Sequence, residues 1–325
     1  MERDAQALAA PVLRRHGRIP NIGDTLFRGA AMMAGLSVLL VVGLMLYELV
    51  DKSRLSLDKF GIGFLTGTTW DPVDEVFGAA PAIYGTLVSA GIALLVALPI
   101  SIGAAIFLAE MAPSWLRNPL SFVVEMLAAI PSVVYGLWAL YVLVPWVGDP
   151  VETTLRDYLS FIPLFNGPIR GGYGMLAAGL ILAIMILPII TAISRDLMQA
   201  VPNSQREAML ALGATKWEVV TGAIIPYCRS GLVGASILGL GRALGETMAV
   251  LMVIGKDYNI SSSLFRPAST AATTIASEFN EATYPLYISS LVELGLILLG
   301  ITLLVNVLAH LLVWRVAPAP GEVRE

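Results

Sequence analysis

The chain has 325 residues, of which 57% are hydrophobic and 14% charged, and its mean hydropathy is +0.78. A soluble domain needs a polar surface and does not reach such values, so the composition predicts an integral membrane protein. The net charge of −4 without a basic, aromatic-rich patch argues against nucleic-acid binding, and the single cysteine, Cys228, excludes an intrachain disulfide and a cysteine-built metal cluster.

The predicted elements in chain order are a polar tail and six membrane-spanning helices. Each span needs about 20 apolar residues to cross roughly 30 Å of hydrocarbon. The tail, residues 1–28, leads into a long apolar run, and we expect this run to be retained because a cleavable signal peptide has a shorter apolar core. The expected transmembrane domain is 29–316, with spans at about 29–50, 83–109, 120–146, 173–193, 230–254 and 287–314 and a C-terminal tail at 317–325. The predicted fold class is an all-α polytopic membrane protein.

The distribution of lysine and arginine predicts the orientation of these spans. Most of the 20 basic residues lie in the two tails, the 110–119 turn and the 194–229 loop, although the 51–82 loop carries three on the other side. Cytoplasmic segments are enriched in these residues. We therefore expect both termini and the 194–229 loop to be cytoplasmic.

The first loop on the other side of the membrane mixes aromatic and acidic residues. Residues 60–87 mix Trp70, Phe77 and Tyr84 with a few carboxylates, while glycine and proline argue against one long helix. This segment could lie along the membrane interface as a platform for an external partner. An aromatic belt with an incidental acidic loop explains the same chemistry at least as well.

The polar segment between the fourth and fifth spans, residues 201–226, contains two helix-start patterns in tandem. Ser204 stands three residues before Glu207, and Thr215 stands three before Glu218. Each pair has the spacing of a capping box, in which the hydroxyl accepts from a backbone amide and the carboxylate reaches back to the first residue. We expect a helix to begin at each pair.

A glycine and a proline complete this pattern. Gly213 falls where the first helix needs a left-handed residue to end, and Pro226 stands where a new membrane helix can begin without its missing N–H being needed. The segment therefore predicts a helix, a tight turn and a second short helix. Lys216 and Trp217 of the second helix would project from the membrane.

The same segment resembles the EAA loop of bacterial ABC-importer permeases, whose pattern is E-A-A-x3-G-x9-I-x-L-P. The match departs at three apolar positions, Met209, Ala223 and Ile225. In that family the short coupling helix of this loop docks into a groove on a cytoplasmic ATPase. The resemblance implies ATPase-coupling roles for Glu207, Ala208, Gly213, Lys216, Trp217 and Pro226. A capped helical hairpin on another kind of membrane protein is the alternative.

Two ionisable residues, Arg242 and Glu246, fall within the fifth expected span. A charge near the centre of a membrane costs about 2.5 to 3.5 kcal/mol, but residues four apart on a helix share a face and can neutralise one another. One interpretation is a salt bridge that fixes the rotation of the helix. The other is an anion contact, in which the planar guanidinium grips a tetrahedral oxyanion and Glu246 holds it in place. The chemistry favours neither.

Three more ionisable residues fall within expected spans: Glu125, Glu293 and His310. We expect each to be a buried hydrogen-bonded group or a residue near the membrane interface. His310 lies close to the end of its span, so a structural role is favoured over proton transfer.

A second resemblance involves three separated segments, FGAAPAIYGTL at 77–87, IPSVVYGLWAL at 130–140 and GRALGETMAV at 241–250. They look like those of phosphate-importer permease subunits of the PstC type, and the similarity extends over about 26–316. It implies the type I permease fold, phosphate as substrate, a PstA-type partner permease, a PstB-type ATPase dimer and a PstS-type binding protein. It also favours Arg242 and Glu246 as pathway residues.

The chain lacks a G-x4-G-K-[ST] phosphate loop, so we expect it to bind no cofactor and to rely on ATP and Mg held by the ATPase partner. The absence of H-E-x-x-H and G-x-S-x-G patterns argues against an enzyme. An importer of another oxyanion such as sulfate remains the nearest alternative. A gradient-driven secondary transporter is less favoured, because it would have no use for a coupling loop.

Overall fold

The computed structural model describes residues 22–316 and divides the chain into two compact units, residues 1–48 and 49–325. Of the expected tail 1–28, residues 1–21 lie outside the described residues, whereas 22–28 already belong to the first helix, so the tail is shorter than predicted. The expected tail at 317–325 also lies outside the described residues. In the first unit, α1 (Ile22–Lys52) is one continuous helix whose apolar side chains are exposed. A helix that is apolar all round suits a lipid environment.

The described residues contain six helices long and apolar enough to cross a membrane, as the sequence predicted. Three of them are assembled from shorter segments joined by π-helical turns. The second unit contains, in chain order, α2 (Arg54–Phe60), α3 (Gly63–Thr66), β1 (Trp70–Asp71), β2 (Val76–Phe77), α4 (Ala80–Ile106), η1 (Phe107–Met111), α5 (Ser114–Ala129), α6 (Ser132–Trp138), η2 (Ala139–Leu143), α7 (Val144–Trp146), η3 (Val147–Val151), α8 (Glu152–Leu159), η4 (Pro163–Phe165), α9 (Met175–Gln199), α10 (Asn203–Ala211), α11 (Lys216–Val219), η5 (Val220–Ile224), α12 (Ile225–Gly245), α13 (Met248–Leu251), α14 (Ala271–Glu278) and α15 (Pro285–Val316).

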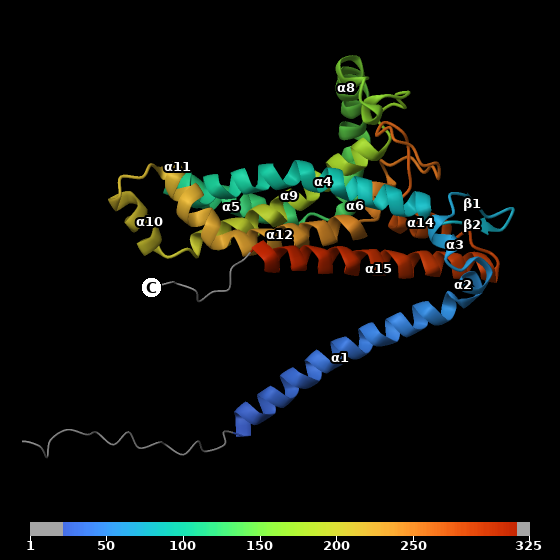
Figure 1. The fold of residues 1–325 in the computed structure, drawn as a ribbon, viewed down its shortest axis with the longest axis horizontal. Coiled ribbons are helices and arrows are strands. Elements are labelled where there is room, and N and C mark those ends of the chain that lie inside the picture. Colours follow the sequence, from blue (N-terminus) through green and yellow to red (C-terminus); the bar gives the residue numbers. More distant parts are fainter. Residues whose placement is uncertain (1–21, 317–325) are drawn as a thin grey trace, which may run out of the picture. The chain divides into compact units, whose positions relative to one another are not determined.

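Helix α9 is the centre of the second unit. It packs most extensively against α4 and then against α12, and α12 in turn packs on α15 (Figure 1). Small side chains make the α4 contact close, since Ala90, Ala93 and Ala97 are fully buried and a Cβ on Gly179 would lie 2.5 Å from Ile92. Membrane helices associate through such close packing, because lipid is as apolar as the helices themselves.

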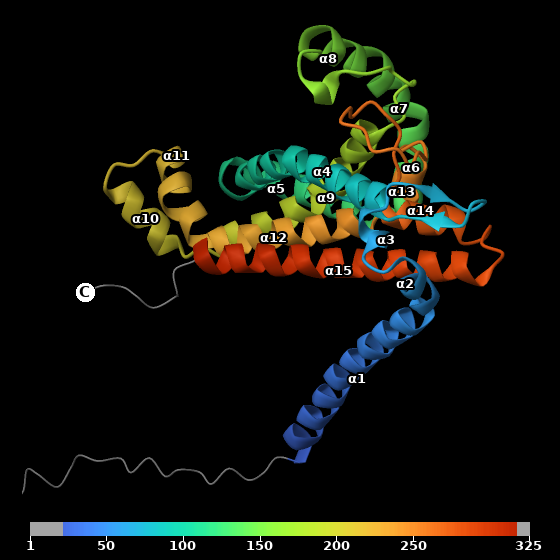
Figure 2. The same cartoon turned by 45° about the vertical axis from the view of Figure 1, so that its right-hand side comes forward.

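The two ends of this bundle differ in structure. Helices α10 and α11 lie at one end, and α14 with the β1–β2 ribbon lies at the other (Figures 1 and 2). We call these the loop end and the ribbon end. The expected absence of a single long helix across 60–87 is confirmed, because this stretch forms the ribbon and its turns before α4 begins at Ala80.

The third expected span, 120–146, is wrong as a single helix. Helix α5 ends at Ala129, Ile130 and Pro131 have extended backbone, and the membrane-length helix is instead Ser132–Leu159. Proline donates no backbone hydrogen bond and pushes the preceding residue out of the helical region, which explains the break.

The fifth expected span, 230–254, is displaced toward its N-terminus. The observed helix runs from Lys216 to Gly245, and a separate short helix, α13, follows. Glycine stabilises helices poorly, and Gly239, Gly241 and Gly245 cluster where the helix ends.

A buried carboxylate organises the ribbon end. The Glu278 side chain is 6% exposed and accepts hydrogen bonds from Lys256 Nζ at 2.6 Å, from Tyr258 Oη at 3.0 Å and from Tyr287 Oη. Burial alone would raise the pKa of Glu278, but the hydrogen bonds from Lys256 and Tyr287 outweigh it and lower the pKa below its ordinary value. The ionised carboxylate thus ties the 255–278 segment to α15.

Replacing Glu278 with Gln should lower the free energy of unfolding at neutral pH by about 1 to 3 kcal/mol, since hydrogen bonds to a charged group are lost. A carboxylate with a lowered folded-state pKa stabilises the protein above its unfolded pKa, near 4.3, and this stabilisation is lost as the pH falls through the folded value. The difference in melting temperature between wild type and Glu278→Gln in detergent should therefore be full at pH 7 and shrink below about pH 4. A difference independent of pH would contradict the ion-pair role.

A second test concerns the close approach of α4 to the segment before α14. A Cβ on Gly85 would lie 2.2 Å from the backbone oxygen of Ser269, whereas one on Gly91, in the same helix, would meet nothing within 4 Å. Gly85→Ala should therefore cost about 1 to 3 kcal/mol through overpacking. Gly91→Ala should be neutral or slightly stabilising. Thermal unfolding in detergent compares the two, and equal melting temperatures would refute the contact.

Candidate coupling site and anion pathway

The turn between α10 and α11 has the predicted geometry. Gly213 has a φ of +84°, in the left-handed region that favours glycine. The capping box at Thr215 is present: its Oγ1 accepts from the Glu218 amide at 3.4 Å, and the Glu218 carboxylate accepts from the Thr215 amide at 2.7 Å. These contacts fix the direction in which α11 leaves the turn.

The first predicted capping box is wrong. Pro202 occupies the cap position of α10, no side chain caps this helix, and Ser204 lies within its first turn. Proline has a fixed φ and its backbone nitrogen needs no partner, so Pro202 sets the helix entry without a hydroxyl. Glu207 therefore does not cap the helix. It is exposed on α10, beside the exposed Ala208.

The prediction that a new helix begins at Pro226 is wrong. Helices α11 and α12 form one continuous helix through η5, where the amide of Ile225 donates to the carbonyl of Val220, five residues back. Proline lacks the N–H for an ordinary helical bond and clashes with the carbonyl four residues earlier, and the wider π-helical turn accommodates it. The short second helix is thus the first turn of the spanning helix Lys216–Gly245.

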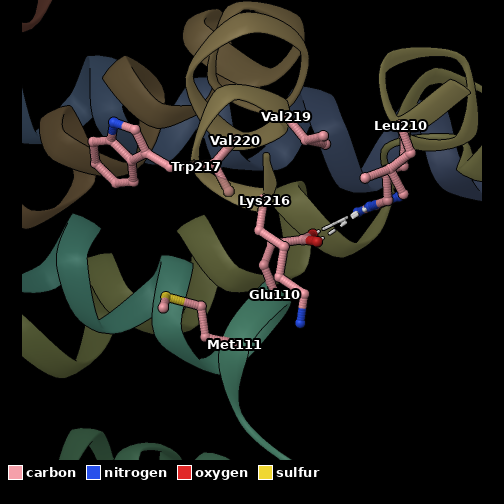
Figure 3. A pocket seen from close by; sticks show the side chains of 8 residues that line it. Glu110, Met111, Leu210, Lys216, Trp217, Val219 and Val220 are labelled. Atoms are coloured by element: carbon pink, nitrogen blue, oxygen red, sulfur yellow. Dashed lines mark hydrogen bonds and ion pairs between the residues drawn. The ribbon is translucent and has the colours of Figure 1, made fainter. Parts of the chain in front are cut away.

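An apolar pocket lies between α10, α11 and the end of α4 (Figure 3). Its walls include Met111, Leu210, Val219 and Val220, and Trp217 stands at its side with 64% of its surface exposed. Lys216 is also exposed. An exposed tryptophan beside a partly open apolar pocket is typical of protein-binding surfaces, where aromatic residues are enriched.

Arg206 is the principal residue at this end that the sequence did not reveal. Its guanidinium pairs with the Glu110 carboxylate, with Nη2 to Oε1 at 2.8 Å, and also donates to the backbone oxygens of Met198 and Val201. Glu110 lies 96 positions earlier in the chain. The two residues meet because α4, which leads into the turn with Glu110, packs against α9, which leads into α10.

The predicted helical pairing of Arg242 with Glu246 is wrong. Helix α12 ends at Gly245, and Glu246 has extended backbone with its Oε1 3.4 Å from the amide of Ala249, at the start of α13. The Arg242 side chain is exposed, lies near the Tyr135 phenol, and makes no hydrogen bond or ion pair with any residue between 22 and 316. The guanidinium is therefore available to a ligand.

Two helix interruptions flank this arginine. The break at Pro131 precedes α6, the break after Gly245 precedes α13, and α6 and α13 pack directly, since a Cβ on Gly136 would lie 3.0 Å from the Cα of Ala249. Discontinuous helices that meet within a membrane are typical of transporter binding sites.

The other ionisable residues within the expected spans differ in their contacts and exposure. Glu125 accepts from Arg195 Nη2 at 3.0 Å, which ties α5 to α9, but its side chain is 52% exposed, so it is hydrogen-bonded and not buried. Glu293 is buried beside Ser56, as predicted. His310 is exposed on α15.

Comparison with known proteins identifies the family. Residues 101–318 match the model of the binding-protein-dependent transport system inner membrane component family. The chain belongs to this family. That description makes it a multi-pass membrane protein and one component of a transport system that includes a binding protein.

Relatives are similar over nearly their whole length. The chain is 46% identical to the phosphate transport system permease protein PstC of Haemophilus influenzae, covering 92% of this chain and 96% of that protein. It is also 46% identical to the PstC protein of Mesorhizobium japonicum, with 92% of each covered. The PstC 2 protein of Mycobacterium tuberculosis is 40% identical, with 89% of this chain and 91% of that protein covered.

Solved structures of ABC transporters share the fold. A chain of a bacterial alginate ABC transporter superposes with a TM-score of 0.61 at 15% identity, covering 90% of this chain and 97% of that one. A chain of the MetNI methionine ABC transporter gives 0.56 at 16% identity, covering 77% and 100%. These similarities confirm the predicted type I permease fold.

Proposed function

We propose that this chain is the PstC-type permease subunit of an ATP-driven phosphate importer. One observation carries the choice of substrate: relatives similar over about nine-tenths of the chain are named phosphate transport permeases. The chain acts as a transport subunit rather than an enzyme. ATP is hydrolysed, with Mg, on a separate ATPase.

The proposed assembly places the chain beside a PstA-type permease in a bacterial cytoplasmic membrane, with a PstB-type ATPase dimer inside and a PstS-type phosphate-binding protein outside. Both termini and the loop end face the cytoplasm, as the basic residues indicate. The exposed Glu207, Ala208, Lys216 and Trp217 then contact the ATPase. Gly213 holds their two helices at a fixed angle, and the π-helical turn before Pro226 joins them to the membrane helix.

In the proposed mechanism the binding protein delivers phosphate to the ribbon end, and the anion meets Arg242 in a cavity shared with the partner permease. An unpaired arginine suits this task, because its planar fork binds a tetrahedral oxyanion through parallel hydrogen bonds and stays protonated. Glu246, nearby on the unwound segment, disfavours permanent occupancy by an anion. ATP-driven closure of the motor moves the coupling helices, and the bundle rocks to release phosphate inward.

Arg242→Ala should lower phosphate uptake roughly 10- to 100-fold, the loss expected when a charged hydrogen-bonding group is removed from an anion. The measurement is uptake of labelled phosphate into proteoliposomes of the complete complex, with ATP inside and the binding protein outside. Arg229→Ala, which removes a cation from the same helix far from the break, is the matched control and should transport normally. Normal uptake by Arg242→Ala would show that this residue is not part of the pathway. Preferential uptake of sulfate by wild type would show that phosphate is not the substrate.

Gly213→Pro should uncouple hydrolysis from transport. Proline fixes φ near −65°, whereas this turn needs +84°, and it removes the hydrogen bond from the residue's amide to the Leu210 carbonyl at 2.9 Å. ATP hydrolysis should continue while phosphate uptake falls at least about tenfold, the effect of about 1.4 kcal/mol. Gly234→Ala, where a Cβ meets nothing within 4 Å, is the control. Unchanged uptake per ATP in Gly213→Pro would count against the role of the turn.

A further inference from the structure

Helix α10 is short, uncapped by any side chain and not fully buried, so its own residues stabilise it weakly. It has 9 residues, no side chain caps its N-terminus, and none of its residues is fully buried. Isolated helices shorter than about 12 to 15 residues are marginal in water. The position of α10 must therefore come from contacts with the rest of the bundle.

Arg206 supplies the strongest of these contacts. Its Nε and Nη2 both approach the Glu110 carboxylate, at 3.2 and 2.8 Å to Oε1. Nη2 also donates to the Met198 carbonyl at 2.7 Å, and Nη1 donates to the Val201 carbonyl and lies 3.4 Å from Asn203 Oδ1. All three guanidinium nitrogens are in use. Lysine, with a single nitrogen, cannot reproduce this set.

The surroundings make this contact strong. The side chains of Arg206 and Glu110 are 17% and 18% exposed, so water screens the pair only partly. Removing one partner would leave the other charge half-buried and uncompensated. The contact is therefore expected to resist breaking when α10 is pushed.

The contact also joins three helices at one point. Glu110 belongs to η1, the π-helical turn that ends α4, and Met198 belongs to the last turn of α9. The final carbonyls of a helix lack their usual partners within it, and the guanidinium adds a donor at the α9 end, where the Met198 carbonyl also accepts from the Val201 amide at 3.3 Å. Helices α4 and α9 form the most extensive packing contact in the second unit.

We propose that Arg206 is a positioning residue for transport, which fastens α10 to the α4–α9 pair so that a displacement of α10 moves both helices as one body. The proposal rests on the proposed function, because it assumes that α10 receives force from the ATPase. In that mechanism α11 moves α12 directly, as part of the same helix. The Arg206–Glu110 contact provides a second route from the loop end into the bundle.

The test uses Arg206→Gln, Glu110→Gln, their double variant and Arg206→Lys. Arg117→Gln is the matched control for the loss of a nearby cation: Arg117, on α5, lines a pocket with Glu110 and Arg206, but among the described residues it forms no ion pair. Two quantities are measured. One is the exchange rate of the backbone amides of 203–211 in the full chain in lipid nanodiscs, and the other is phosphate imported per ATP hydrolysed by the complete complex.

Amide exchange tests the fastening independently of the substrate. Arg206→Gln and Glu110→Gln should each raise exchange across α10 at least tenfold, with α12 and the control unchanged. The double variant should exceed neither single variant, because both substitutions remove the same contact. Unchanged protection of α10 in the single variants would overturn the proposal whether or not phosphate is transported.

The phosphate-to-ATP ratio separates positioning from folding, since a loss of folded complex lowers uptake and hydrolysis together and leaves their ratio unchanged. Arg206→Gln should lower the ratio at least tenfold, and Arg206→Lys should recover part of it by restoring the charge. A normal ratio in Arg206→Gln, or an equal loss in Arg117→Gln, would refute the transport role. If wild type imports no phosphate, the proposed function fails and amide exchange alone decides the fastening.

Discussion

The structure depends on one constraint: within a membrane, each backbone hydrogen-bonding group needs a partner inside the protein. Proline breaks this pattern wherever it occurs in a helix. Three π-helical turns close on the residue just before a proline, at Ala112, Val144 and Ile225, whose amides bond to carbonyls five residues back. At Pro131 the chain breaks instead, and a new helix starts. At these four sites a proline marks where a helix widens or stops, whereas Pro99, Pro119 and Pro188 lie inside continuous helices.

These interruptions lie where function is proposed. The turn η1 presents Glu110 to Arg206, and η5 joins the coupling loop to α12 without a break. The continuous helix Lys216–Gly245 has 30 residues and is about 45 Å long at 1.5 Å per residue. One end carries the exposed Trp217 and the other ends beside Arg242. In the proposed mechanism a motion at the loop end would therefore reach the Arg242 guanidinium, which has no partner among residues 22–316, through one continuous helix.

Close packing at the centre lets the bundle transmit such motions. Alanines on α4 and glycines on α9 and α12 allow backbones to approach, so that Gly239 meets Ile190 and Gly231 meets Leu197 with no space for a Cβ. Interfaces packed in this way move as bodies rather than deform. The ribbon end is held differently, by aromatic side chains around Trp70 and by the ionised Glu278.

Local patterns in the sequence predicted much of this protein. Six spans, the left-handed Gly213 and the Thr215 capping box follow from apolar length and short-range hydrogen bonding, and the EAA-type spacing led to the family. These features depend on residues within one or two turns of each other. The limits of the third and fifth spans were misplaced, because apolar content does not register a break at Pro131 or Gly245.

The sequence by itself determined the membrane class, the number of spans and the position of the turn between α10 and α11, since composition and local spacing encode them. The tertiary structure alone decided which charges have partners. Arg242 and Glu246 have helical spacing but are separated by the end of α12, whereas Arg206 and Glu110 lie 96 positions apart and form a close ion pair. The reason is that a partner for a charged side chain is chosen by the packing of whole helices, and this packing depends on side-chain shape along their full length.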